Sequence, residues 1–263
     1  MTIGFFYYPE NKKAAAWAKK MQIWMNSKQP SIEFTNEKPK FLIVLGGDGA
    51  ILEAARKYQG QDVTIVGFNL GHVGFLASVR KSKDFLAGLN NLLKGKYHIT
   101  KRLMMSAMVE RKGKAVFSTN AMNDVVVQST LSIVELEADI QGYPIQYVRG
   151  SGLLVATATG STGYNLSAHG PIIMPDIECF IITELLDHNI PTPSVVVKRD
   201  QEITIKILNF RKPNVVISAD GSDPFPLQAG DVIKIRRSPR LVKFAEFEKN
   251  YFFKSLQEKF AFR

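Results

Sequence analysis

The sequence contains an uninterrupted apolar run that ends abruptly in glycine. Phe41 to Leu45 is entirely apolar, and Gly46-Gly47-Asp48-Gly49 follows it directly. Such a run is typical of a strand that is buried on both faces of a parallel sheet. A helical pattern comes next, at Ile51, Ala54, Ala55 and Tyr58, and Val63 to Phe68 then predicts another strand. This order of strand, glycine turn, helix and strand predicts a doubly wound, Rossmann-like α/β domain.

From about residue 99 the apolar residues recur at every second position instead. Val134, Leu136, Ala138 and Ile140 alternate with acidic residues, and further strand patterns occur at Val125 to Gln128, Val195 to Lys198, Ile203 to Leu208, Val215 to Ser218 and Val232 to Arg236. Many short strands separated by Gly, Asn and Pro turns predict a β-sandwich. We therefore expect an N-terminal α/β domain at 1–98, a C-terminal β-sandwich domain at 99–240, and a segment at 241–263 that packs back on the N-terminal domain.

The composition excludes several classes of protein. Hydrophobic residues make up 45% and charged residues 22% of the chain, which is ordinary for a globular protein. No apolar run approaches the roughly 18–20 residues of a membrane span, and no secretory signal pattern begins the sequence, so we expect a cytoplasmic protein without a membrane partner. Cys179 is the only cysteine, which excludes an internal disulfide and a cysteine metal site. The net charge of +10 favours anionic ligands. Because no nucleic-acid module is recognisable, small-molecule nucleotides are the expected partners.

The glycine turn lies where open α/β sheets bind ligands, at the carboxyl end of a predicted strand. Its glycines let the backbone approach a ligand closely, and its N–H groups and the next helix N-terminus can hold phosphate. An aspartate there repels phosphate unless it binds Mg²⁺ or accepts a proton from an attacking hydroxyl. Asp48 is therefore the candidate catalytic group. A plainer interpretation stays open, in which Asp48 only caps the helix.

Two further segments carry candidate ligand-binding residues. The loop at 67–76 contains three more glycines and Asn69, whose amide can donate and accept hydrogen bonds. We interpret His72 in this loop as a structural hydrogen bonder rather than as a catalyst. In the β region, Asn123-Asp124 precedes an apolar strand. An amide next to a carboxylate suits a ribose diol, whereas the plainer interpretation is a turn pair before a strand.

The longest signal extends from Arg149 to Pro171. A strand there leads into a cluster of glycines and hydroxyl residues, and then into a short helix with Tyr164. Backbone N–H groups and small hydroxyls suit phosphate, and an aromatic face suits a base. Farther along the chain, Ser218-Ala219-Asp220-Gly221 has the chemistry of a hairpin turn.

Together these segments resemble the NAD kinase family, in the same order and over roughly residues 40 to 235. Gly46 to Gly49 looks like the family's GGDG motif, and Gly67 to Leu76 looks like its second glycine loop. Asn123-Asp124 matches its Asn-acidic pair, and Asp220-Gly221 matches its late Asp-Gly turn. The segment at 159–171 is the most specific match, because lipid kinases and phosphofructokinases share the glycine tetrapeptide.

The resemblance implies an enzyme that transfers the terminal phosphoryl group of ATP, or of polyphosphate, to the 2'-hydroxyl of the adenosine ribose of NAD, giving NADP. Asp48 would act as general base or orient the hydroxyl, Asn123 and Asp124 would hold a ribose, and Thr162 and Tyr164 would contact the nucleotide. Mg²⁺ would be carried by the phosphates, with Asp48 as its one candidate protein ligand. The family also implies a homotetramer or homodimer in which neighbouring subunits complete the site.

Besides Asp48, the candidate substrate- and cofactor-binding residues are Gly47, Gly49, Asn69, Gly71, Phe75, Asn123, Asp124, Arg149, Ser151, Thr159, Ser161, Thr162, Tyr164, Asn165, Ser167 and Asp220. Four positions depart from the family's usual residues. Asp124 stands where glutamate is common, Ser151 replaces an aspartate, Ala50 replaces a hydroxyl residue and Gly163 replaces an alanine. Because Ser151 removes a charge, we expect it to lower affinity or alter specificity.

Two other functions remain as alternatives. A lipid kinase would share the glycine tetrapeptide, but it predicts an apolar lipid slot and membrane attachment. A non-catalytic dinucleotide sensor would explain the departure at Ser151. Formation of NADP in a coupled assay distinguishes an enzyme from a sensor.

Overall fold

The computed structural model describes residues 1–71, 74–187, 192–212 and 214–260. It consists of two compact units, one formed by Met1–Arg102 with Leu241–Arg263 and the other by Leu103–Arg240. The first unit is α/β and the second is rich in β-strands, which confirms the predicted fold class. In the described part of the chain, no helix has the length and apolar character that crossing a membrane requires.

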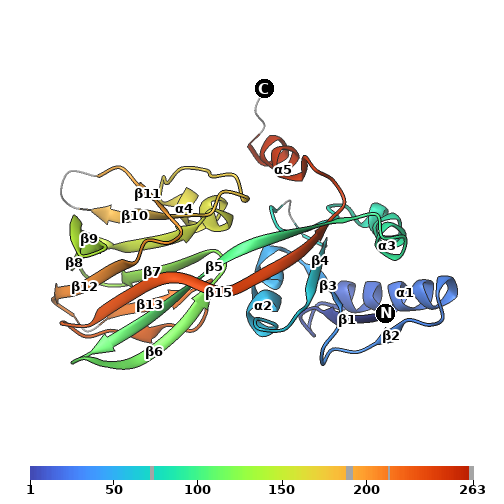
Figure 1. The fold of residues 1–263 in the computed structure, drawn as a ribbon, viewed down its shortest axis with the longest axis horizontal. Coiled ribbons are helices and arrows are strands. Elements are labelled where there is room, and N and C mark those ends of the chain that lie inside the picture. The colour runs from blue at the N-terminus through green and yellow to red at the C-terminus, as the bar shows by residue number, and fades with distance from the viewer. Residues whose placement is uncertain (72–73, 188–191, 213, 261–263) are drawn as a thin grey trace. The chain divides into compact units, whose positions relative to one another are not determined.

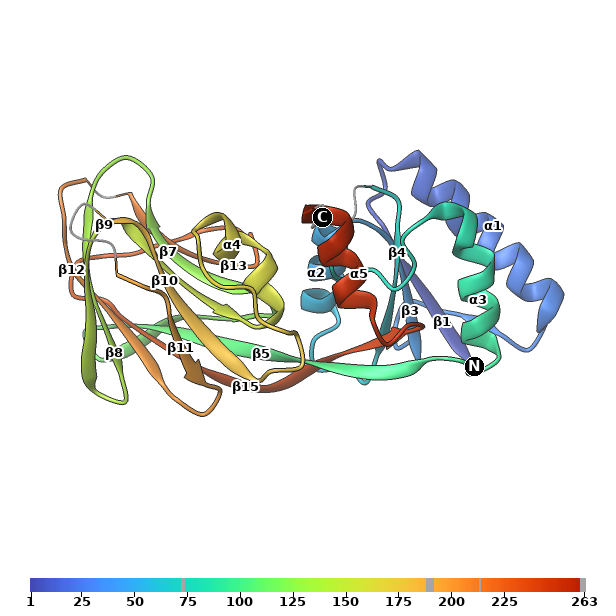
Figure 2. The ribbon, with the colours of Figure 1, turned by 90° about the horizontal axis from the view of Figure 1, so that it is seen from above.

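The first unit contains a parallel sheet with the strand order β2-β1-β3-β4-β15. Its strands are β1 (Thr2–Phe6), β2 (Glu33–Phe34), β3 (Phe41–Gly46), β4 (Thr64–Asn69) and the end of β15 (Val232–Glu246). Its helices are α1 (Lys12–Lys28), α2 (Asp48–Lys57), α3 (Phe85–Leu93), which follows the 3-10 turn Ser82–Asp84, and α5 (Tyr251–Phe260). Figure 2 shows α1 and α3 on one side of β1, β3 and β4, and α2 on the other side.

Covering helices explain why β3 is apolar throughout. All six residues of β3 are buried, as the uninterrupted run predicted. Helix α1 begins at its N-cap Asn11, whose side chain accepts a hydrogen bond from Ala14 N at 3.0 Å. It then packs a stripe of residues at helical spacing into the core, namely Ala14, Ala18, Met21 and Met25.

The register of β3 and β4 brings the two glycine loops together. Gly46 pairs with Asn69, so both strands end at the same level of the sheet. The carboxyl ends of parallel strands meet at one edge, and the segments that follow them therefore become neighbours. Figure 1 shows β3 and β4 side by side in this unit.

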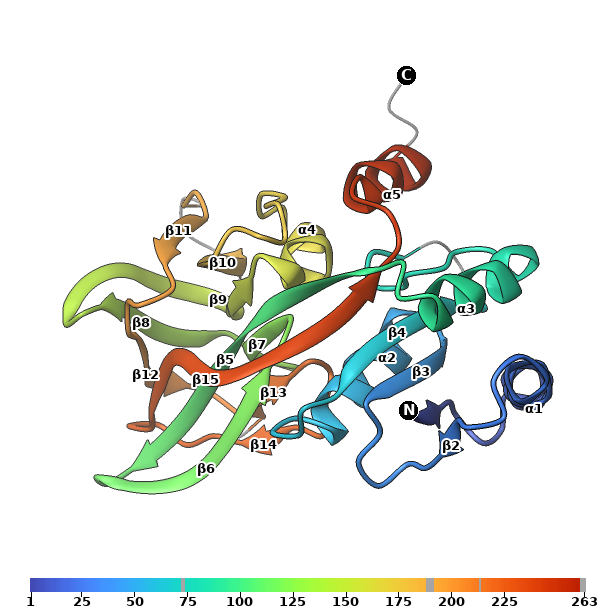
Figure 3. The same cartoon turned by 45° about the vertical axis from the view of Figure 1, so that its right-hand side comes forward.

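The second unit is built from antiparallel strands in the order β14-β13-β7-β9-β8-β12-β15, with β10 beside β9, β11 beside β10, and the β5–β6 hairpin beside β15. The strands are β5 (His98–Arg111), β6 (Lys114–Ala121), β7 (Asp124–Ser129), β8 (Val134–Ile140), β9 (Tyr143–Thr157), β10 (Cys179–Asp187), β11 (Val195–Lys198), β12 (Ile203–Phe210), β13 (Val215–Ala219) and β14 (Phe225–Pro226). Figure 3 shows β5 and β15 running side by side. Two short helical segments, Thr159–Thr162 and α4 (Tyr164–Ser167), follow β9.

Strand alternation produces the core of the second unit. Every second residue of β8 and β12 points inward, so that Val134, Leu136, Ala138, Ile203, Ile205 and Ile207 belong to one buried cluster. Gly152 lies where β9 passes β7, with a φ of +153°. A Cβ at this position would overlap the carbonyl oxygen of Val127. Pairing of β7 with β9, which starts at Asp124, therefore requires glycine here.

Gly152→Ala is expected to destabilise the second unit strongly, by about 3 kcal/mol or more, because backbone atoms of the neighbouring strand must move. Gly142→Ala is the matched control. That glycine also has a positive φ, of 82°, but open space surrounds it, so the cost should be only about 1 kcal/mol. Urea unfolding of both variants measures the difference, and equal losses would contradict the account.

Candidate active site

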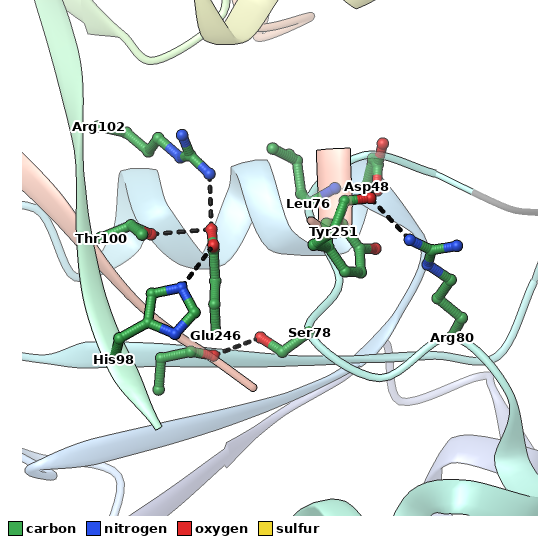
Figure 4. Close-up of polar contacts among 10 residues, drawn as sticks. Asp48, Leu76, Ser78, Arg80, His98, Thr100, Arg102, Glu246 and Tyr251 are labelled. Carbon is green, nitrogen blue, oxygen red and sulfur yellow. Dashed lines mark hydrogen bonds and ion pairs between the residues drawn. The ribbon is translucent and has the colours of Figure 1, made fainter. Parts of the chain in front are cut away.

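Asp48 occupies the first turn of α2, after the N-cap Gly47. Its carboxylate does not bond to that turn. Oδ2 accepts a hydrogen bond from Phe75 N at 2.8 Å, and Oδ1 accepts one from Leu76 N at 3.2 Å. Figure 4 shows the Asp48 carboxylate beside Leu76. The interpretation of Asp48 as a helix cap is therefore wrong, because the carboxylate ties α2 to the second glycine loop instead.

The second glycine loop is shaped around this carboxylate. A Cβ at Gly74 would overlap the carboxylate atoms of Asp48, so only glycine fits there. On the other side of the loop, Asn69 is buried, and its Oδ1 accepts a hydrogen bond from Gly71 N at 3.0 Å. Gly71 is exposed, as is Gly49 in α2. His72 lies outside the described residues.

Sequence reasoning missed two residues in this region, Arg80 in the segment after β4 and Tyr251 in the C-terminal helix. Arg80 Nη2 donates to the carbonyl oxygen of Tyr251 at 2.7 Å, as Figure 4 shows, and the guanidinium lies 4.4 Å from the Tyr251 ring centre. Burial raises the pKa of Tyr251 to about 12 against the opposing effect of the nearby Arg80 guanidinium. A mixed aromatic and basic tail gave no period from which this contact could be inferred.

A second polar cluster in Figure 4 belongs to the strand ends of the first unit. Glu246 Oε1 accepts hydrogen bonds from Arg102 Nη2 at 2.6 Å and from Thr100 Oγ1 at 2.8 Å. His98 Nε2 lies 3.4 Å from Glu246 Oε2. This cluster holds the end of β15 to the start of β5 and contains none of the predicted site residues.

In the second unit, Asp220 organises the backbone of the Asn-acidic pair. Its Oδ2 accepts a hydrogen bond from Met122 N at 2.7 Å, and its Oδ1 accepts bonds from Asn123 N at 2.8 Å and Asp124 N at 3.0 Å. Asp220 has a φ of 49°, in the left-handed region, as befits the turn between β13 and β14. The hairpin turn expected from the sequence thus also places a carboxylate that accepts hydrogen bonds from three backbone N–H groups.

Asn123 and Asp124 form a polar corner with Gly163, in which Asp124 is buried and the other two residues are half-buried. Burial, together with the negative charge of Asp220, raises the pKa of Asp124 to about 7. Asn123 Oδ1 is buried and has no hydrogen-bond partner among the described residues. A Cβ at Gly163 would lie 3.4 Å from Asn123 Nδ2 and 3.9 Å from Asp124 Oδ2, so these three residues meet. A buried acceptor without a donor costs free energy unless a ligand or water supplies one.

The segment after β9 divides into internal and accessible residues. Ser161 Oγ bonds both the N–H and the C=O of Ile173, and Asn165 bonds Ser161 O, Pro171 O and Thr183 Oγ1. Both side chains are fully buried and are occupied by these internal bonds. Thr159 is also buried, whereas Thr162 is half-buried and Tyr164 and Ser167 are exposed.

Arg149 and Ser151 are not brought to this corner within the unit. Asp124 pairs with Ala156 on β9, and Arg149 lies seven residues before Ala156 on the same strand. Seven residues of extended chain span about 23 Å. Arg149 is exposed and lies 3.4 Å from Glu135, its partner on β8. Ser151 is half-buried.

Comparison with known proteins shows the family to which this chain is related. Residues 7–97 match the family model of the ATP-NAD kinase N-terminal domain, and residues 122–247 match that of the ATP-NAD kinase C-terminal domain. The chain belongs to the NAD kinase family. The resemblance to this family is thereby confirmed, and the lipid kinase alternative is set aside.

Individual relatives agree with this membership. The chain is 38% identical to the NAD kinase of Natranaerobius thermophilus over 231 residues, which cover 87% of this chain and 80% of that protein. It is 36% identical to the NAD kinase of Geobacter metallireducens over 219 residues, or 82% of this chain and 77% of that protein. In fold, it is similar to yeast NADH kinase complexed with NADH, with a TM-score of 0.90 at 20% identity over 100% of this chain and 88% of that one. An NAD kinase from Archaeoglobus fulgidus in complex with ATP has a TM-score of 0.79 at 22% identity, over 98% of this chain and 99% of that one.

The pKa of Asp124 predicts a pH-dependent stability. Because it is raised from 3.8 to about 7, the folded chain binds more protons than the unfolded chain between these values, and stability falls as pH rises through this window. Asp124→Asn cannot ionise and escapes this loss. The free energy of unfolding of the variant, relative to that of the wild type, should therefore rise by about 2–3 kcal/mol between pH 5 and pH 8. Urea unfolding measures the gain.

Asp223→Asn is the control for this prediction, because Asp223 is an exposed aspartate of the same turn region. It should follow the wild-type pH dependence. If the difference in free energy of unfolding between Asp124→Asn and the wild type stays constant from pH 5 to pH 8, Asp124 is not the titrating group.

Proposed function

We propose that this member of the NAD kinase family catalyses phosphoryl transfer from ATP to the 2'-hydroxyl of the adenosine ribose of NAD, giving NADP. The observation that carries the proposal is the corner of Asn123 and Asp124. A buried amide oxygen without a donor lies next to a carboxyl group whose pKa is near neutrality. A ribose diol supplies two hydroxyl donors side by side, one for each acceptor, and its binding favours the ionised carboxylate.

Asp48 is the proposed catalytic group. Each of its carboxylate oxygens accepts one backbone N–H, which fixes the plane of the group and leaves a lone pair on each oxygen for a further contact. In an in-line transfer, the 2'-hydroxyl oxygen forms the new bond to phosphorus while the bond to the leaving phosphate oxygen breaks. The hydroxyl proton then passes to Asp48, and positioning supplies most of the acceleration.

The donor phosphates are proposed to lie at the N-terminus of α2. Gly47 and Gly49 flank Asp48, and neither has an atom within 4 Å of the place a Cβ would take, so the backbone is open to a ligand. Mg²⁺ would bind mainly to phosphate and water oxygens, with Asp48 as the protein carboxylate. Polyphosphate would offer the same donor chemistry as ATP.

Self-association into a homotetramer or homodimer is part of the proposal. About 23 Å of strand separates Arg149 from Ala156, the residue that pairs with Asp124. Arg149 and Asp124 therefore cannot hold the same ribose within one subunit. Arg149 and Ser151 would instead contact the dinucleotide bound by a neighbouring subunit. Light scattering of the purified protein determines the oligomeric state. We also propose a cytoplasmic location.

Asp48→Asn tests the catalytic assignment. The amide cannot accept the proton, so turnover should fall by roughly 10²–10⁴-fold, the usual contribution of a general base. Binding of NAD should be largely unaffected, because Asp48 is not one of the proposed ribose residues. NADP formation is measured with glucose-6-phosphate dehydrogenase as coupling enzyme, and NAD binding is measured by calorimetry.

Three outcomes are informative. Full turnover by the variant would contradict the role given to Asp48. Wild-type protein that binds NAD but forms no NADP with ATP and Mg²⁺ would support the dinucleotide sensor instead. Loss of both turnover and NAD binding in the variant would show that Asp48 contributes mainly to binding.

A further inference from the structure

The carboxylate of Asp48 is held by a loop that has no regular secondary structure. Phe75 N and Leu76 N are its hydrogen-bond donors, and residues 74–77 belong to neither a helix nor a strand. Without further support, such a loop would not fix a side chain to the fraction of an ångström that catalysis requires. The contacts that support the loop are therefore part of the machinery that positions Asp48.

Phe75 carries the first of these contacts. Its backbone N–H binds Asp48, and its side chain is only 7% exposed. The ring centres of Phe252 and Phe260, both in α5, lie 5.9 and 6.4 Å from the Phe75 ring centre. Lys259 Nζ, from the same helix, lies 5.1 Å from that centre. The residue that orients one oxygen of Asp48 is thus packed against the C-terminal helix.

Arg80 anchors the other end of the same loop to α5. Its Nη2 donates to Tyr251 O at 2.7 Å, and its Nη1 lies 3.2 Å from Glu258 Oε2. These partners are two turns apart on α5, so one guanidinium binds along the length of the helix. Between Phe75 and Arg80, Ser78 Oγ donates to Ala245 O at 2.6 Å, which adds a bond to the end of β15.

We propose that α5 is a positioning element for catalysis, in which Phe252 and Arg80 hold the loop that orients the Asp48 carboxylate. The inference rests on the proposed function for its effect on turnover, but its structural part is independent of that function. Phe252 packs on the ring of Phe75, a candidate substrate-binding residue, and Arg80 binds Tyr251 O and Glu258. Both residues are thus placed to act on Asp48 through Phe75 and the loop. Loosening α5 should therefore lower kcat more than it raises the KM for NAD, whose ribose is assigned to Asn123 and Asp124.

Phe252→Ala is the test variant, and Phe253→Ala is its matched control. Phe253 is the same residue type at the next position of α5, but it is 53% exposed and its ring contact is with Phe252 rather than with Phe75. Phe252→Ala should lower kcat by about 10–100-fold, because displacing a catalytic group by about 1 Å costs up to 10²-fold. The KM for NAD should change by less than about threefold. Phe253→Ala should leave kcat near the wild-type value, and Phe252→Leu should restore most of the loss.

Amide hydrogen exchange at Phe75 and Leu76, followed by NMR, reads the same effect without any substrate. Both amides should exchange at least about tenfold faster in Phe252→Ala than in Phe253→Ala, because their hydrogen bonds to Asp48 open more often. Arg80→Gln, which loses the pairing with Glu258, provides a second test if Phe252→Ala fails to fold. Unchanged exchange at both amides in a folded Phe252→Ala or Arg80→Gln would overturn the proposal. If the amides exchange faster in the variant but the wild-type protein forms no NADP, α5 remains the support of the loop and only the proposed function is rejected.

Discussion

The pair of hydrogen bonds from Phe75 N and Leu76 N to the Asp48 carboxylate is the interaction on which the site of the first unit depends. An aspartate in the first turn of a helix usually accepts bonds from that turn or stays in solvent. Here the carboxylate leaves its own helix and joins the segments that follow β3 and β4. The absence of a Cβ at Gly74 makes the approach possible, and the contacts of α5 hold the donors in place. One carboxylate is thus fixed by residues that lie in three separate parts of the sequence.

In the second unit, too, an aspartate carboxylate accepts hydrogen bonds from backbone N–H groups that are distant in the sequence. The carboxylate of Asp220 binds three successive backbone N–H groups and fixes the chain at Asn123 and Asp124. Its charge then disfavours the ionised form of the neighbouring Asp124, whose pKa is already raised by burial. The unliganded corner therefore keeps a buried acid and an unpartnered amide oxygen that both lower stability. Stability lost at a polar corner of this kind is characteristic of binding sites, where a ligand supplies the missing partners.

Local patterns predicted β3, β4, several strands of the second unit and the glycine loops, but not the strands β5, β6 and β10. The apolar run at 41–45 became the fully buried β3, and the alternation at 134–140 became β8, because burial on one or two faces imposes those periods. The helical tail at 251–260 was not predicted. Its buried face includes Tyr251 and Ser255, and the exposed Phe253 obscures the amphipathic pattern. The site residues Ser161 and Asn165 were chosen for their hydrogen-bonding groups, but these groups are used inside the fold. Partners that lie 27 or more residues apart, such as Asp48 with Phe75 and Asp220 with Asn123, leave no local signal in a sequence.

The most direct test of the central claim is the kinetics of Gly74→Ala, combined with a crystal structure of the variant. The new methyl group must displace the carboxylate of Asp48, because it would occupy the same space. The account predicts a folded protein in which Asp48 is shifted, turnover is lowered by about 10²-fold, and the affinity for NAD is nearly unchanged. Wild-type turnover together with a displaced Asp48 would contradict it, because the orientation set by Phe75 and Leu76 would then be irrelevant to catalysis.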